Sequence, residues 1–249
     1  MQYHILNGDA LKDQIPTDKI AGHFIICREC LIDGPLEGAS LIEFWDNRAA
    51  FIEKNYGTKS GTYNEVVLPE FQKILELDQN EVVNLWFGDD LFCLMNLCFV
   101  VYLLDTIGHQ NNIFLVKAQT ENWLEFGGMS PSELTAAYDA KKPLTKEEFD
   151  LLLNCWAAFQ QNDLAQLQTL AKTPTNSFPF LSEVLQAHID RFPVNGDLGR
   201  PQRRLQAIQS QLQTTKFGEI FQVFNQTEGV YGFGDLQVRA MYEALKKRA

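Results

Sequence analysis

The run LFCLMNLCFVVYLL, from Leu91 to Leu104, is the longest apolar stretch of the sequence. It has 14 residues, fewer than the roughly 20 that a membrane-spanning helix needs, so it predicts no membrane segment. A helix of this composition is apolar on nearly every side and has to be buried on more than one of them. The rest of the chain must therefore place other elements around Leu91–Leu104.

Short apolar segments alternate with helical patterns through the first half of the chain. Strands are predicted in residues 3–8 (YHILNG), 23–30 (HFIICREC), 81–88 (EVVNLWFG) and 111–118 (NNIFLVKA). Helices are expected in residues 10–15, 40–57, 62–78 and 91–104, with Ser40 as a cap, Gly57 as a stop and a break near Pro69. Strands that alternate with helices pair in parallel, so the sequence predicts an α/β fold with a doubly wound, mostly parallel sheet of about four strands.

Beyond Gly127–Gly128 the pattern becomes helical, and no further strand is expected. Thr145 and Glu148 have the spacing of a capping box at the start of a helix. Helical patterns continue to the end of the chain and include residues 201–212, 217–224 and 235–246. We therefore expect an α/β domain in residues 1–126, a linker in 127–144 and an all-helical domain in 145–249.

The charge of the chain is uneven. The formal net charge is -11, which disfavours attraction of the whole molecule to nucleic acid or to an anionic membrane. From Arg200 onward, however, the balance is about +4, which leaves about -15 for residues 1–199. Five cysteines without framework spacing indicate free thiols, and the N-terminus lacks the features of a signal peptide. Together these observations predict a cytoplasmic protein.

Polar clusters follow three of the predicted strands. They are Asn7 and Asp9 after the first strand, Arg28, Glu29 and Asp33 after the second, and Asp89 and Asp90 after the third. The carboxyl ends of parallel strands share one edge of a sheet, and ligands bind in the crevice there. We therefore expect these side chains to form one rim, in which Asp9 and Asp90 are acid/base or metal groups, Arg28 pairs with an anion and the others bind the ligand.

Helix capping is an equally simple explanation of the aspartates. Asp9 and either Asp89 or Asp90 stand where helices are predicted to begin, and a carboxylate there accepts hydrogen bonds from free backbone N–H groups. Such a cap stabilises a helix by about 1 kcal/mol without any function. Both explanations can hold for adjacent residues, because one aspartate can cap the helix while the other faces the crevice.

The charges of the rim limit its ligand. Several carboxylates repel a bare phosphate, so a phosphorylated ligand would need Arg28 or a bridging Mg²⁺. A cation held by Asp9, Asp89 and Asp90 is an option, although no ligand spacing supports it specifically. The sequence contains neither GxGxxG nor GxxxxGK[ST], and therefore lacks a dinucleotide fingerprint and a P-loop.

Other polar residues favour structural interpretations. Cys27 and Cys30 form a CxxC, but they lie in or just after a strand instead of at a helix N-terminus, which disfavours redox chemistry. His188 lies on the apolar face of its predicted helix and is expected to be a core histidine with satisfied hydrogen bonds. His4 opens the first strand and is a site candidate only if it points to the rim. The basic tail fits solvated helices better than a DNA-binding helix-turn-helix, because its last two helices are joined by about ten residues instead of 3–4.

Short motifs in a fixed order resemble the bacterial family known as domain of unknown function eighteen thirty-five. They are HILNGDAL (4–11), RECLIDGP (28–35) and LWFGDDL (85–91). The helical half, with WAAF (156–159), GRPQRRL (199–205) and GFGD (232–235), is similar to the helical domain that often follows it. The resemblance covers most of the chain and implies that Gly8, Gly34, Pro35 and Trp86 belong to the same rim. It implies no activity, because the family has none assigned, and the histidine or similar polar residue of its third motif is replaced here by Gly88 or Asp89.

The sequence thus predicts a protein that binds a small polar or phosphorylated ligand at the rim, with metal-assisted catalysis as one form of this hypothesis. A second hypothesis is a non-catalytic regulatory or interaction protein whose helical half contacts a protein or DNA partner. A third is a scaffold in which capping alone explains the aspartates. The strand order, the oligomeric state and the substrate do not follow from the sequence.

Overall fold

The structure is a computed structural model that describes residues 1–118, 123 and 126–247. Its strands are β1 (Gln2–Leu6), β2 (His23–Ile26), β3 (Val82–Trp86), β4 (Ile113–Val116) and β5 (Lys142–Pro143). The helices that alternate with them are α1 (Asp9–Gln14), α2 (Leu41–Tyr56), α3 (Leu68–Leu75), α4 (Leu91–Thr106) and α5 (Pro131–Asp139). The later helices are α6 (Lys146–Gln160), α7 (Leu164–Leu170), α8 (Leu181–Asp190), α9 (Arg200–Leu212), α10 (Phe217–Thr227) and α11 (Asp235–Lys246). A π-helical turn, η1 (Tyr63–Val67), precedes α3, and a 3-10 turn, η2 (Gly229–Tyr231), precedes α11.

The strands form one sheet in the order β2-β1-β3-β4-β5. β1 pairs in parallel with β2 on one side and with β3 on the other. The chain therefore leaves β1 toward one edge of the sheet and later returns to build the other edge. This reversal between β1 and β3 is the topological switch point, where open α/β sheets commonly bind ligands at the carboxyl ends of the strands. The expected α/β fold with a mostly parallel sheet, followed by a helical part, is confirmed.

β5 corrects the expectation that no strand follows Gly128. It pairs antiparallel with β4, with Phe114 opposite Pro143. The segment 127–144, which we expected to be a linker, thus contains both α5 and an edge strand of the sheet. A two-residue strand that ends in proline has neither the length nor the alternation that predicts a strand, and proline is accepted only at an edge.

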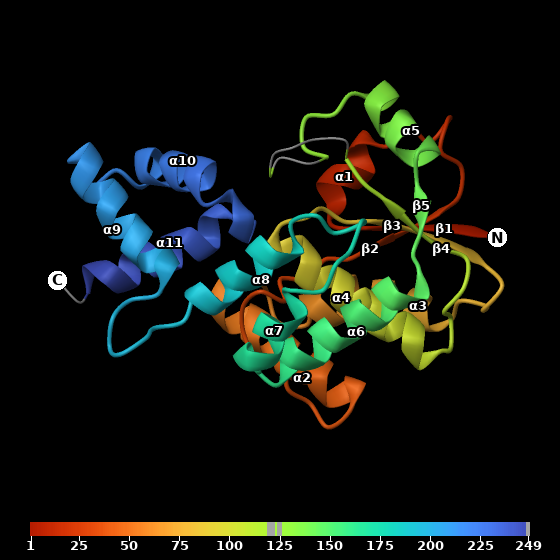
Figure 1. The fold of residues 1–249 in the computed structure, drawn as a ribbon, viewed down its shortest axis with the longest axis horizontal. Coiled ribbons are helices and arrows are strands. Elements are labelled where there is room, and N and C mark those ends of the chain that lie inside the picture. The colour runs from red at the N-terminus through yellow and green to blue at the C-terminus, as the bar shows by residue number, and fades with distance from the viewer. Residues whose placement is uncertain (119–122, 124–125, 248–249) are drawn as a thin grey trace.

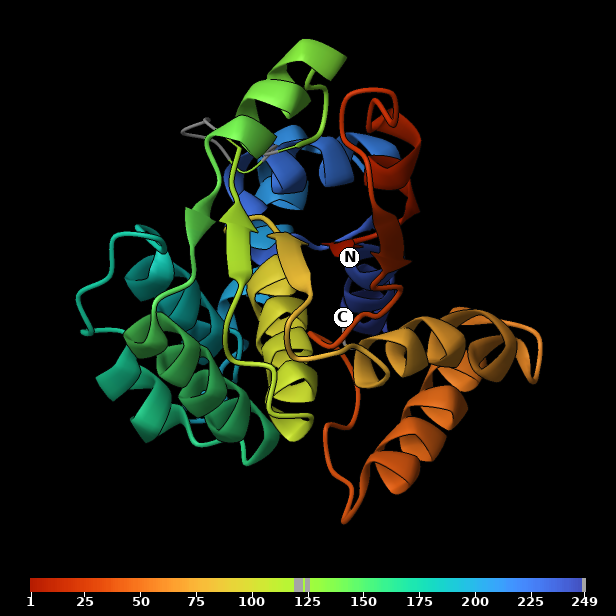
Figure 2. The same cartoon turned by 90° about the vertical axis from the view of Figure 1, so that its right-hand side faces the viewer.

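Helices cover both faces of the sheet. α1 and α5 lie on one face, and α2, α3, α4 and α6 lie on the other (Figures 1 and 2). Alternate strand residues point to opposite faces, so Leu6 and Trp86 belong to the smaller apolar cluster under α1 and α5, whereas Ile5 and Leu85 belong to the larger one. α4 runs through the larger cluster and packs against α3, α6 and α8. The prediction that Leu91–Leu104 is a helix buried on several sides is confirmed.

Local signals place several helix ends as predicted. The Ser40 hydroxyl accepts a hydrogen bond from the Glu43 N–H, and α2 stops at Gly57 in the left-handed conformation. Thr145 and Glu148 form the predicted capping box of α6. Residues 62–78 change from the π-helical turn η1 to α3 beside Pro69, which confirms the predicted break.

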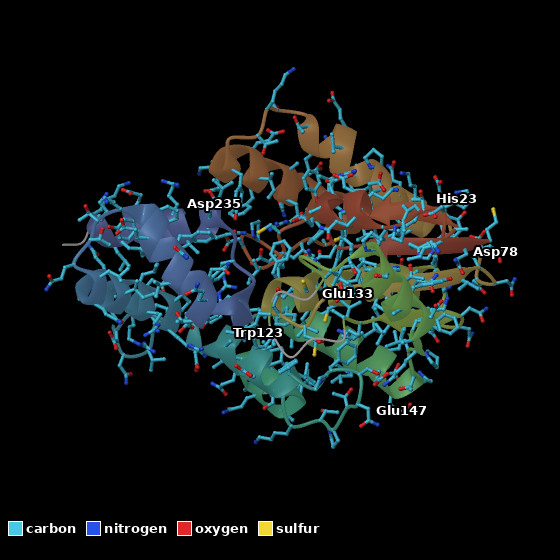
Figure 3. The ribbon with its side chains drawn as sticks, turned by 90° about the horizontal axis from the view of Figure 1, so that it is seen from above. His23, Asp78, Trp123, Glu133, Glu147 and Asp235 are labelled. Atoms are coloured by element: carbon cyan, nitrogen blue, oxygen red, sulfur yellow. The ribbon has the colours of Figure 1, made fainter. Side chains whose placement is uncertain are left out.

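The strands point toward the C-terminal helices. In Figure 3, His23 at the start of β2 and Asp78 ahead of β3 lie at one end of the molecule, and Asp235 at the start of α11 lies toward the other. The larger apolar cluster continues without a break from α4 into α8, η2 and α11. No helix in the described ranges is both long enough and apolar enough to cross a bilayer.

Candidate functional site

The loops after β1 and β3 meet at the switch point. Leu6 pairs with Trp86, and the next N–H, that of Asn7, donates to the Trp86 carbonyl at 3.2 Å. Two cavities open here, and both are lined by Asn7. The first, which we call the rim cavity, has a volume of about 350 Å³ and is also lined by Asp9, Arg28 and Tyr56. The second, which we call the switch-point cavity, has a volume of about 200 Å³ and is also lined by Trp86, Asp90 and Trp123.

A hydrogen-bond network holds the side chain of Asn7. Its Oδ1 accepts from Asn96 Nδ2 at 2.8 Å, and its Nδ2 donates to Cys93 Sγ at 3.0 Å. Asn96 is fully buried on α4 and also donates to the Glu29 carbonyl at 2.9 Å. Among the bonds that the described residues make, Asn7 keeps one amide hydrogen and one oxygen lone pair for another partner. The loops after β1 and β2 are thereby tied to the first turns of α4 through the Asn7 and Asn96 side chains.

Asp9 is paired with Arg28 and does not cap α1, which corrects the capping expectation for this residue. Gly8 stands at the cap position and makes no side-chain bond. Arg28 donates to Asp9 from Nε at 2.8 Å and from Nη2 at 2.8 Å, and its Nη1 donates to the Val66 carbonyl at 3.1 Å. These bonds lower the pKa of Asp9. The Asp9 side chain is 59% exposed, so its carboxylate remains accessible from the rim cavity.

Asp90 is the aspartate that caps α4, as expected for one of the adjacent pair. Its Oδ1 accepts from the Cys93 N–H at 2.7 Å. Burial, helped by the neighbouring charge of Asp89, raises the pKa of Asp90 to about 6. Gly232, in the turn after η2, packs directly on this carboxylate, because a Cβ at Gly232 would lie 2.5 Å from Oδ1. The turn between η2 and α11 therefore covers Asp90.

Asp89 and Trp86 face other partners at the same strand end. Asp89 accepts from Lys117 Nζ at 2.6 Å, just past the end of β4. The Trp86 indole N–H donates to His4 Nδ1 at 3.1 Å on the face covered by α1 and α5. His4 is fully buried, and burial lowers its pKa to about 4. His4 thus holds the Trp86 indole from the sheet face covered by α1 and α5 and does not point to the rim.

Glu29 is turned inward. Its carboxylate accepts from Arg48 Nε at 2.8 Å and Nη2 at 2.7 Å and from the Tyr63 hydroxyl at 2.8 Å. The side chains of Glu29 and Arg48 are both 0% exposed. Arg48 also donates to the carbonyls of Cys30 and Pro35. This buried ion pair holds the loop after β2 in place. Arg48 also screens the negative charge of Glu29 from a ligand.

Asp33 lies at the far end of the same loop. It accepts from the Tyr56 hydroxyl at 2.7 Å and faces Arg191 of the segment after α8, with Nη2 3.6 Å from Oδ1. Cys30 lies between these groups, and burial raises the pKa of its thiol to about 11. Cys27 is buried, and burial raises its thiol pKa further. Both cysteines are therefore protonated thiols at neutral pH, which disfavours redox chemistry at the CxxC.

The structure thus brings part of the predicted rim together. Asn7, Gly8, Asp9, Arg28 and Glu29 line the rim cavity, whereas Trp86 and Asp90 line the switch-point cavity. Asp33 and Asp89 line neither of them. Within the described part of the chain, no three His, Cys, Asp or Glu side chains are grouped so that they could hold a metal ion. Asp9, Asp89 and Asp90 instead have separate partners.

Several residues of the site were not predicted from the sequence. Asn96 is a lone amide inside the apolar run of α4, and that position is a signal that could have been used, because a buried amide needs hydrogen-bond partners. Arg48 is one charge in a polar helix, and Gly232 belongs to a turn far along the chain. Trp123 has its ring 5.0 Å from that of Phe180 at the start of α8, and it lines the switch-point cavity. Nothing in the local sequence of Arg48, Gly232 or Trp123 indicates these contacts.

Fold and site together define an α/β protein with a switch-point crevice that is covered by C-terminal helices. The chain matches no family model, no curated protein and no solved structure. Its resemblance to the family of unknown function therefore stays a prediction.

Proposed function

We propose that the strand-end rim binds a small polar ligand that spans the rim cavity and the switch-point cavity across Asn7. The observation that carries this proposal is that Asn7 lines both cavities while its amide is held by Asn96 and Cys93. A preorganised amide with unused hydrogen-bonding capacity at a topological switch point is suited to fix the orientation of a ligand.

The charges around Asn7 favour a polar ligand over a bare phosphate. Arg28 is already engaged by Asp9 and by the Val66 carbonyl, and Glu70 lies 3.5 Å from its Nη1. A phosphate would have to compete with these carboxylates. Hydroxyl or amine groups of a ligand can instead donate to the exposed oxygens of Asp9.

Asp90 gives this site a group for proton transfer. With a pKa of about 6, both its protonated and its ionised form are populated near neutral pH, which suits a general acid or base. In the catalytic form of the proposal Asp90 exchanges a proton with the ligand, and Asp9 and Arg28 orient it. In the regulatory form the same residues bind the ligand without chemistry.

Thermal unfolding with matched probes tests the proposal. Ribose and uridine are compared with ribose 5-phosphate and uridine monophosphate, each with and without Mg²⁺. We expect an uncharged probe to raise the Tm by about 5 °C when it is present at 100 times its Kd, and its phosphorylated partner to raise it less.

Three variants give the test its specificity. Asn7→Ser and Asp9→Asn should reduce the stabilisation by the probe, because they alter the shared amide and the exposed acceptor. Asp13→Asn, an exposed position on the same helix as Asp9, should leave it unchanged. A probe that stabilises wild type and Asn7→Ser equally would show that the ligand binds elsewhere.

A further inference from the structure

A third cavity lies where the loop after β2 meets α8, α9 and α11. Its volume is about 400 Å³, within the range of about 300–1,000 Å³ that is typical of small-molecule sites. None of its lining residues also lines the rim cavity or the switch-point cavity. A ligand here would be independent of the proposed function of the rim.

The cavity contains two opposite charges that leave hydrogen-bonding capacity unused. Arg191 donates from Nη1 to the Ile32 carbonyl at 2.7 Å, and its Nη2 lies 3.6 Å from Asp33 Oδ1, which is an ion pair without a hydrogen bond. Toward the described residues, Nε and Nη2 make no hydrogen bond. The Arg191 side chain is 18% exposed, so these donors are partly shielded from bulk solvent.

A third polar group in the same wall needs a donor. Gln202 lines the cavity, and its Oε1 is buried with no hydrogen-bond partner among the described residues. A buried carbonyl without a partner is costly, so it normally bonds to water or to a ligand. Gln237, also in the wall, is different, because its amide already bonds to Cys30 Sγ and to the Gly234 N–H.

The remaining walls are apolar. The guanidinium of Arg191 lies over the ring of Phe233, with its carbon 5.8 Å from the ring centroid. Leu198 of the loop before α9 and Met241 of α11 add aliphatic surface, and Leu245 adds more one turn later. An occupant of this cavity therefore needs an apolar body as well as a polar head.

We propose that this cavity binds a free α-amino acid with an apolar side chain. The ligand carboxylate would take the unused donors of Arg191, and its ammonium group would donate to Asp33 and Gln202. The apolar side chain would lie against Leu198, Phe233 and Met241. A ligand with only a negative charge would face Asp33 without compensation, and one with only a positive charge would face Arg191, so the paired charges select a zwitterion.

Isothermal titration of the full chain tests this inference with L-phenylalanine and L-leucine as probes. 3-Phenylpropionate lacks the ammonium group and phenethylamine lacks the carboxylate, so the two analogues isolate each charge. We expect saturable binding of one amino acid per chain. Each analogue should bind at least about tenfold more weakly than the amino acid, because it leaves a charged hydrogen-bonding group unpaired.

Filling the cavity should abolish binding. Ala240 and Ala244 line it from exposed positions of α11, so Ala240→Trp and Ala244→Phe add bulk without removing a core contact. Leu236→Trp is the matched control, because Leu236 is on the same helix, 52% exposed and outside the cavity wall. Circular dichroism confirms that each variant is folded.

Three results would overturn the inference. The first is that neither amino acid binds to the folded wild type, which would mean that the cavity holds only water. The second is that a single-charge analogue binds with the same affinity as the amino acid. The third is that binding survives in both filled variants. None of these outcomes bears on the rim, whose probes and variants differ.

Discussion

Glu29 and Asp9 are both carboxylates bound by an arginine, but their surroundings differ. The Glu29–Arg48 pair is fully buried, whereas Asp9 is 59% exposed beside Arg28. Removing one partner of a buried pair leaves a charge without compensation in a medium of low polarity. An exposed pair is replaced by water at little cost.

We therefore predict that Glu29→Gln lowers the free energy of unfolding by about 3–5 kcal/mol. Asp9→Asn, the control, should lower it by less than about 1 kcal/mol. Urea unfolding followed by tryptophan fluorescence measures both values. Equal costs would mean that the two pairs contribute alike to stability, against the burial described above.

Asp90 predicts how stability depends on pH. Its pKa is about 6 in the folded protein and near 3.9 in an unfolded chain. The folded state therefore holds this proton more tightly. Its contribution to the free energy of unfolding is fully present below pH 4 and is lost as the pH rises to about 6, and it amounts to about 3 kcal/mol.

Asp90→Asn isolates this effect, because asparagine is also a good helix cap but does not titrate. Between pH 4 and pH 7 the free energy of unfolding of the wild type should change relative to the variant by about 2 kcal/mol, in the direction of lower stability at higher pH. Urea unfolding at each pH gives the difference. Parallel pH profiles of wild type and variant would refute a raised pKa.

At the scale of elements, the turn between η2 and α11 and the start of α4 fit together through one glycine. Gly232 has φ of 63° and ψ of 21°, and Gly57 at the end of α2 has φ of 66° and ψ of 22°. The two glycines have nearly the same left-handed conformation. Their surroundings differ. A Cβ at Gly57 would meet nothing within 4 Å, whereas one at Gly232 would clash with the Asp90 carboxylate.

Because the two glycines have the same conformation, alanine substitutions at both separate the cost of backbone strain from the cost of the contact with Asp90. Gly57→Ala should cost about 1 kcal/mol, which is the penalty of a left-handed residue with a Cβ. Gly232→Ala should cost that amount and about 1–3 kcal/mol more for overpacking. Urea unfolding of both variants gives the difference, and equal values would show that the turn moves away from Asp90 without cost.

The ends of the helices were predictable to different degrees. Ser40, Gly57 and Thr145 act through neighbours in the sequence, so their local patterns were sufficient. Asp9 occupies an equally suitable position, but it pairs with Arg28, 19 residues away. A cap and a tertiary ion pair can use the same residue, and the local pattern does not show which of them forms.

For the whole molecule, the alternation of strands and helices predicted the fold class, because it follows from periodic burial along each element. The rim was predictable only in part. Parallel pairing brings Asn7, Arg28 and Asp90 to one edge, but it does not say which way each side chain turns. That depends on Asn96, Arg48 and Gly232, which reach the rim from α4, α2 and the C-terminal turn, and such long-range contacts have no local pattern.

The two outer strands of the sheet also bear on how copies of this protein behave in a crowded solution. An outer strand with free N–H groups can template a strand from another molecule and start aggregation. Here β5 is only two residues long and ends in Pro143, which has no N–H to offer. On the opposite side, the Ile26 N–H of β2 is bonded to Glu70 of α3 at 2.9 Å. Proline on one side and a carboxylate on the other thus discourage the sheet from growing into an intermolecular one.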